Sequence, residues 1–166
     1  DALQGYVLRS PHAHALIRRI DTALATALPG VHLIATAADL AADGLGPLPC
    51  MAAVKPLIVP PRPALADGRV RHVGDPVAFI VADSVGVARE AAELIEVDYE
   101  PLPAVIATGS ALAPDAPKVW PEFDGNLVVH CEHGDKTDVR ARIASAPHRV
   151  TVELLNQRIA VSPMEP

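Results

Sequence analysis

The chain has 166 residues, of which half are apolar and only 3% are aromatic, so its core has to be built mainly from Ala, Val, Leu and Ile. This length accommodates one sizeable domain, or one domain and part of another. The net charge of −6 argues against a nucleic-acid partner, because affinity for phosphate backbones comes largely from clustered Lys and Arg.

Apolar segments separated by proline and glycine predict small elements before Gly44. In chain order we expect a strand over 5–10, an apolar segment over 14–20, a helix over 22–28, a strand over 31–35 and at most one helical turn over 37–40. Pro11 ends the first strand because proline cannot donate to a ladder, and Asp21 can cap the first helix. Thr36 can cap the last turn in the same way.

A long irregular segment follows over 44–63, with six prolines between Pro47 and Pro63. Loops of this length in compact domains are usually functional or packed against a partner, and the apolar content here favours a partner. Extended structure is expected again over 64–73, with a possible turn at Asp67-Gly68.

The most informative stretch is 71–105, which predicts a turn, a strand, a helix and a second strand. Gly74 and Pro76 flank Asp75 and force a turn before an apolar strand over 77–83 that is expected to be buried on both faces. Ser84 caps a helix whose apolar stripe is formed by Val87, Ala88, Ala91, Ala92, Leu94 and Ile95. With the strand over 96–105, we expect one unit in which the helix covers a sheet.

The composition shifts to Ala, Pro, Gly and Ser after Val105, which predicts a linker and a domain boundary. A strand near Asn126, a helix over 136–145 and a strand over 148–155 are expected beyond it. Cys50 and Cys131 are too few and too far apart for a disulfide framework, so we expect reduced thiols. No apolar run is long enough to span a bilayer, and the N-terminus lacks a signal segment and a methionine, as in a piece of a longer protein.

His12 and His14 have the spacing that places two imidazoles on one side of a strand, as in some zinc sites. No third ligand or orienting carboxylate is fixed by the sequence. Histidines beside a proline turn more often bind backbone groups or face solvent, so the structural interpretation is favoured.

The run His130-Cys131-Glu132-His133 contains suitable ligand types, but on a strand its members alternate between two faces and cannot converge on one ion. A catalytic Cys131–His133 pair shares one face, although no orienting group or oxyanion hole accompanies it. The structural interpretation is again favoured.

Asp75, Asp98 and Glu100 can be considered as carboxylates for acid–base chemistry. A turn aspartate bound to its own backbone, and solvated acids before a proline, explain them more simply. The Gly44-Leu45-Gly46 motif is a weak phosphate-loop signal, because no clear strand-to-helix cradle surrounds it.

Five motifs stand in order along nearly the whole chain, namely 8–15 with 20–21, 28–31 with 37–40, 72–78, 97–105, and 156–158 with 163–166. Their succession resembles the large, molybdopterin-binding subunit of the xanthine dehydrogenase and aldehyde oxidase family, in particular the carbon monoxide dehydrogenase-like large subunits. The resemblance implies an α+β fold. An α/β hammerhead domain over 1–105, with a mixed sheet and packed helices, would be followed by a linker over 106–125 and the truncated start of a molybdopterin-binding domain over 126–166.

Full-length members of this family hydroxylate carbon centres or oxidise carbon monoxide at a molybdenum held by a pterin cofactor. The resemblance implies the cytosine dinucleotide form of that cofactor, electron transfer to iron–sulfur clusters and flavin on companion domains or subunits, and a cytoplasmic location. The chemistry belongs to the cofactor, while the protein supplies position and electrostatics.

In such proteins the glycine-rich cofactor loops and the catalytic glutamate lie beyond Pro166, so no catalytic, cofactor-binding or metal-binding role is carried over to a numbered residue. Gln157 and Glu165 come nearest, and we expect a scaffold role for both. The leading hypothesis is an inactive fragment of a molybdenum hydroxylase whose proline-rich loop packs on cofactor domains and on the iron–sulfur subunit. The alternatives are a free-standing hammerhead module that binds a small ligand or a partner chain, and a zinc hydrolase that uses His12 and His14.

Overall fold

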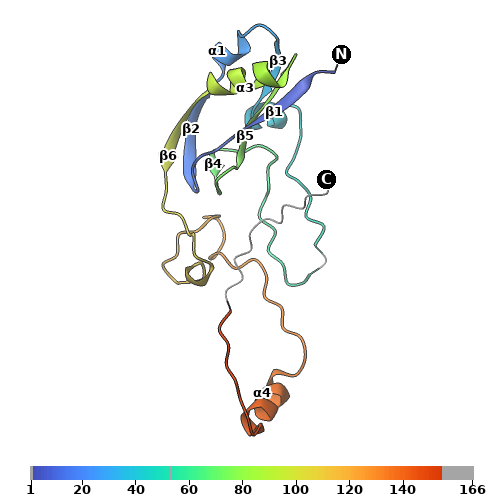
Figure 1. Cartoon of the computed structure of the whole chain (residues 1–166), viewed down its shortest axis with the longest axis vertical. Coiled ribbons are helices and arrows are strands. Elements are labelled where there is room, and N and C mark those ends of the chain that lie inside the picture. The colour runs from blue at the N-terminus through green and yellow to red at the C-terminus, as the bar shows by residue number, and fades with distance from the viewer. Residues whose placement is uncertain (1, 53, 155–166) are drawn as a thin grey trace. The chain divides into compact units, whose positions relative to one another are not determined.

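The computed structural model describes residues 2–52 and 54–154, which fall into two compact units over 1–130 and 131–166. The first unit contains two three-stranded sheets (Figure 1). The strands of the first sheet stand in the order β1 (Gln4–Arg9), β5 (Pro76–Ala82) and β3 (Val31–Ala35). Those of the second stand in the order β4 (Arg69–Val70), β2 (Ala15–Asp21) and β6 (Glu96–Pro101). The α+β class is therefore confirmed, but both sheets are antiparallel where one mixed sheet was expected.

Helix α3 (Val85–Glu93) covers the first sheet and lies beside the short helix α1 (Ala23–Thr26) (Figure 1). The predicted cap is confirmed, since the Ser84 hydroxyl accepts a hydrogen bond from the Val87 amide at 3.2 Å. The buried residues between the helix and the sheet are six alanines and two isoleucines, against which larger, partly buried apolar side chains pack: Ala25, Ala78, Ile80, Ala82, Ala88, Ala91, Ala92 and Ile95. Because alanine side chains are small, the helix can lie close to the strands. This agrees with the expectation, from the low aromatic content, that the core is built from small aliphatic residues.

The expected strand–helix–strand unit is divided between the two sheets. Strand β5 pairs with β1 on one edge and with β3 on the other, so it has no free edge left for β6. Strand β6 pairs with β2 instead. Val77, near the start of β5, is packed with Ala15, Ala66 and Val70 in a second core, so β5 contributes to both cores.

The burial of β5 on both faces is confirmed only in part. Val77, Ala78, Ile80 and Ala82 are buried, whereas Phe79 is 38% exposed on the face of the first sheet opposite Ile80. The Phe79 ring lies over Gly5 of the neighbouring strand, where an added Cβ would meet it at 2.8 Å. Glycine at this position therefore makes room for an aromatic side chain.

Helix α1 is shorter than the predicted helix over 22–28, although the Asp21 carboxylate accepts a hydrogen bond from the Ala23 amide as a cap would. Helix α2 (Ala37–Ala42) is longer than the single turn expected. Its start is fixed by Asp39, whose carboxylate accepts hydrogen bonds from both the amide and the hydroxyl of Thr36 and completes a capping box.

Beyond the second sheet the chain contains a 3₁₀ turn, η1 (Thr108–Ser110), and helix α4 (Lys136–Ser145), whose predicted bounds are confirmed. The strands expected near Asn126 and over 148–154 are wrong, since the only pairing in those described segments is an isolated bridge between Leu57 and Val129. The Asn126 side chain instead binds backbone groups of Ala111, Pro117 and Val119. Residue 155 lies outside the described residues. No helix in the described ranges is long and apolar enough to cross a membrane.

Candidate functional site

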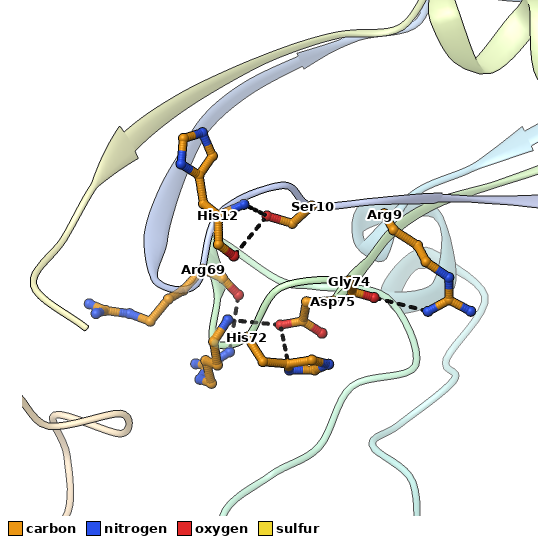
Figure 2. A network of polar contacts seen from close by, with 8 residues as sticks. Arg9, Ser10, His12, Arg69, His72, Gly74 and Asp75 are labelled. Atoms are coloured by element: carbon orange, nitrogen blue, oxygen red, sulfur yellow. Dashed lines mark hydrogen bonds and ion pairs between the residues drawn. The ribbon is translucent and has the colours of Figure 1, made fainter. Parts of the chain in front are cut away.

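Residues of the motifs over 8–15 and 72–78 meet in a polar junction, where β1 ends and the turn before β5 begins (Figure 2). Ser10 is 2% exposed, and its amide donates to the Asp75 carbonyl at 2.9 Å, while the Gly74 amide donates to the Ser10 carbonyl at 2.8 Å. The Ser10 hydroxyl accepts from the His12 amide at 3.0 Å, and Arg9 Nη1 donates to the Gly74 carbonyl at 2.9 Å. The junction thus satisfies backbone groups that would otherwise be buried without partners.

Asp75 organises its own turn. Its Oδ2 accepts a hydrogen bond from the Arg71 amide at 2.9 Å and lies 3.8 Å from His72 Nδ1. Gly74 has a φ of +86°, a conformation that favours glycine, and this allows the chain to reverse before the strand. The prediction that Asp75 is a turn residue bound to its own backbone is confirmed. Its carboxylate contacts the Arg71 amide and the His72 ring.

His14 and His12 lie in the connection between β1 and β2, not on a strand, and they do not converge. The His14 ring is nearly buried, with Nδ1 at 2.7 Å from the Pro103 carbonyl and Nε2 at 3.0 Å from Arg69 Nη1. Because arginine can only donate, Nε2 has to accept, and the proton on Nδ1 is donated to the carbonyl. Both ring nitrogens of His14 are therefore occupied.

His12 has a different environment, since its ring packs on Tyr99 with centroids 4.8 Å apart. Its side chain points away from the Asp75 carboxylate (Figure 2). Within residues 2–52 and 54–154 there is no group of three or more side chains that could hold a metal ion. The geometry thus gives no support to a zinc site at these histidines.

The motif over 130–133 is exposed and does not form the expected strand. Cys131 is an exposed free thiol, and Glu132 Oε1 pairs with Nζ of Lys136, the first residue of helix α4, at 2.5 Å. The pair is of the ordinary i, i+4 type on a solvated surface. This arrangement gives no evidence of a catalytic pair between Cys131 and His133.

The three carboxylates considered for acid–base chemistry are not brought together. Asp98 and Glu100 are exposed on one face of β6, where Glu100 forms an ion pair with Arg18. Tyr99 lies between them and so faces the other side of the strand, where it senses the charge of Asp75. Asp75 is therefore on the opposite side of β6 from the other two acids.

The Tyr99 phenol is a titratable group of this region with a shifted pKa. Burial raises its pKa above the ordinary value, the negative charge of Asp75 raises the pKa further, and a hydrogen bond with the Ser10 side chain opposes both effects. The environment thus favours the neutral phenol.

This raised pKa predicts a loss of stability in alkali. The neutral phenol stabilises the fold fully below its unfolded-state pKa, and the contribution is lost as the pH rises through the higher folded-state value. From about pH 10 upward, urea midpoints should fall more steeply for the wild-type chain than for Tyr99→Phe. Parallel profiles for the two proteins would contradict the assignment.

The Gly44-Leu45-Gly46 motif ends helix α2. Gly44 has a φ of +74°, its amide donates to the Ala41 carbonyl at 3.0 Å, and the Leu45 amide donates to the Leu40 carbonyl at 2.9 Å. These two bonds define a Schellman motif, so the glycines serve a helix terminus.

Sequence reasoning did not identify the contact between Arg71 and Trp120. The Arg71 guanidinium lies 3.6 Å from the centroid of the Trp120 ring, and Nε of Arg71 is buried without a hydrogen-bond partner. Both residues line a groove that is also lined by the proline-rich segment. No local pattern relates two residues so far apart in the chain, so no signal in the sequence could have revealed the pair.

Two small antiparallel sheets with helix α3 packed on the first define the architecture, and the comparisons identify it as an α/β hammerhead. Residues 1–103 match the sequence profile "Aldehyde oxidase and xanthine dehydrogenase, a/b hammerhead domain". The chain belongs to this family.

Relatives and solved structures agree with the family assignment. The chain is 37% identical to the carbon monoxide dehydrogenase large chain of Afipia carboxidovorans over 175 residues, which cover 98% of this chain and 21% of that protein. The structure of carbon monoxide dehydrogenase from Oligotropha carboxidovorans matches with a TM-score of 0.72 and 39% identity, covering 88% of this chain and 19% of that one. Quinoline 2-oxidoreductase from Pseudomonas putida matches with a TM-score of 0.70 and 42% identity, covering 76% and 16% respectively. The chain thus spans about a fifth of the length of these relatives.

Proposed function

We propose that this chain is part of the large subunit of a molybdenum-dependent oxidoreductase and supplies its hammerhead domain. The observation that carries the proposal is the similarity to the carbon monoxide dehydrogenase large chain, which runs through 98% of this chain and accounts for 21% of that protein. A solved carbon monoxide dehydrogenase among the structural relatives is a Cu,Mo enzyme. Another relative is the large molybdopterin subunit of nicotinate dehydrogenase from Eubacterium barkeri.

The buried side chains of the described residues offer no set of unpaired polar groups for a pterin cofactor. A pterin presents many donors and acceptors, so its cradle needs several convergent polar groups. Over 2–52 and 54–154 the single buried side-chain polar atom without a partner is Arg71 Nε, and that guanidinium already lies on an indole ring. We therefore propose that molybdopterin, in its cytosine dinucleotide form, is held elsewhere in the parent subunit. Gln157 and Glu165 lie outside the described residues, and their scaffold role stays a prediction.

The proposed role of the chain itself is to pack against other domains through the proline-rich segment. Large apolar side chains of this segment are exposed to water, at 55% for Leu48, 88% for Met51 and 51% for Val59. Exposed apolar surface on a proline-rich segment of this kind is typical of an interaction site. Its proposed partners are the remaining domains of the same subunit and iron–sulfur and flavin subunits or domains.

The domain division remains part of the same proposal, with the hammerhead over 1–105, a linker over 106–125 and the start of a molybdopterin-binding domain over 126–166. A cytoplasmic location is likewise proposed.

The experiment compares the 166-residue chain with the product of the natural reading frame that contains it, expressed with its neighbouring subunits. Molybdenum is measured by mass spectrometry, and oxidation of carbon monoxide, aldehydes and purines is followed with an electron-accepting dye. We expect molybdenum and turnover only in the longer product. Molybdenum or turnover in the chain alone would overturn the proposal, and so would their absence from the longer product. A stable chain alone, with a natural stop after Pro166, would favour the free-standing binding module.

A further inference from the structure

A groove of about 800 Å³ runs between the end of β1, the proline-rich segment and residues 119–128. Its polar lining comes from Arg9, Arg62, Arg71, His72 and Asp75, and the rest is largely aliphatic side chains, prolines and the Trp120 ring. We call it the arginine groove. It combines apolar walls with a cluster of cationic groups, the usual composition of a site for an amphipathic partner.

The charge of the arginine groove is opposite to that of the chain. Three arginines face one carboxylate, Asp75, in a protein whose net charge is −6. That carboxylate already accepts a hydrogen bond from the Arg71 amide and lies next to His72. Among the described residues, none of the three arginines forms an ion pair within 4.0 Å.

The contacts that these arginines do form are with neutral groups. Arg9 Nη1 donates to the Gly74 carbonyl, and Arg71 Nη1 donates to the Arg69 carbonyl at 3.1 Å. Burial lowers the pKa of Arg71, and the charge of Arg69 lowers it further, while Glu122, Asp75 and Asp67 act in the opposite direction. No carboxylate lies within ion-pair distance of the Arg71 guanidinium among the described residues, so an added carboxylate in direct contact with it would be stabilising.

We infer that the arginine groove receives an extended, carboxylate-bearing segment of the same large subunit, with apolar side chains on either side of the acid. This inference rests on the proposed function. The arginines supply the planar donors that bind carboxylates bidentately, and the apolar walls and Trp120 cover the flanking side chains. The chain spans about a fifth of its relatives, so the remaining four fifths of such a subunit can provide the segment.

Cys50 allows a direct test, because this exposed free thiol lines the same groove. The natural, molybdenum-loaded enzyme is treated with a short crosslinker that carries a maleimide and a hydrazide, and carboxylates are then activated with a carbodiimide. Peptide mapping should identify an Asp or Glu from outside residues 1–166 of the same subunit as the partner of Cys50. Cys50→Ser is the blank for this crosslink.

Arg62 provides matched variants, since the residue is exposed and its backbone carbonyl accepts a hydrogen bond from the Leu48 amide, which a side-chain substitution leaves in place. Arg62→Glu should reduce the crosslink yield at least about fivefold by repelling the carboxylate, whereas Arg62→Lys, which keeps the charge, should stay within about twofold of the wild type. Equal yields in the two variants would overturn the role of charge. 

Crosslinks only to acids within this chain, to a second copy of the subunit or to another subunit would overturn the inference. Molybdenum content and turnover are measured on the same preparation. A molybdenum-loaded, active enzyme without the expected crosslink would refute the groove assignment alone, whereas an enzyme without molybdenum would refute the proposed function.

Discussion

Replacing Ile80 by alanine is expected to lower the free energy of unfolding of the chain by about 2–5 kcal/mol, the range for large-to-small substitutions in protein cores. Ile80 is fully buried and belongs to the largest side chains of the described core. Its neighbours include Ala88, Ala91 and Ala92, whose methyl groups cannot move into the space left behind. A cavity that cannot collapse keeps its full cost, so we expect a value in the upper half of this range.

The measurement is urea unfolding followed by circular dichroism, with the denaturant dependence checked to be unchanged. Phe79→Ala is the matched control on the same strand, because Phe79 is 38% exposed on the opposite face and water can occupy the space that it leaves. Its substitution should cost clearly less. A loss as large as that of Ile80→Ala would show that the alanine-rich face is not the main core.

Local signals in the sequence were sufficient for the elements around α3. Ser84 is followed by an apolar stripe at helical spacing, and the Gly74-Asp75-Pro76 run specifies a turn whatever else the chain does. Both predictions are confirmed by hydrogen bonds between residues at most four positions apart. Interactions between residues so close in the chain depend on the local sequence alone and can therefore be predicted from it.

The division into two sheets depends on pairings that no local pattern specifies. Strand β6 pairs with β2, so that Asp98 stands opposite Arg19, about eighty positions earlier in the chain. The apolar alternation over 148–154 predicts a strand equally well, yet among the described residues that segment has no pairing partner and does not form a strand. Strand formation is decided by pairing and burial, which a single sequence does not display.

The same limit applies to the candidate site. Spacing alone made His12 and His14 look like paired ligands, while the contacts that determine the state of His14 come from residues 89 and 55 positions away. The Arg71–Trp120 contact joins the predicted hammerhead domain to the segment over 106–125, which its composition predicts to be a linker. Charge and aromatic content can be counted in the sequence, but their convergence on one groove appears only in three dimensions.

His14→Ala is expected to destabilise the chain by about 2–4 kcal/mol, because the substitution leaves two polar groups without their partner in a nearly buried position. The Pro103 carbonyl loses the donor Nδ1–H, and Arg69 Nη1 loses the acceptor Nε2. These contacts fix the ends of β2 and β6 together, so their loss should also lower the cooperativity of the second sheet. Urea unfolding measures the cost, and nitrogen NMR shifts of the imidazole report the Nδ1–H tautomer directly.

His12→Ala is the control, since His12 lies two residues away and packs by ring contact on Tyr99 without filling a buried polar site. It should cost less than His14→Ala. The zinc hypothesis makes the opposite demand on the same two variants: stoichiometric zinc would survive dialysis of the wild type and be lost from both. Nε2 of His14 already accepts a hydrogen bond from Arg69, so zinc could bind this nitrogen only by displacing the guanidinium, whereas the bond from Nδ1–H to the Pro103 carbonyl would be kept. A zinc-free wild-type chain with a large loss of stability for His14→Ala alone would therefore establish His14 as a structural bridge between two strands.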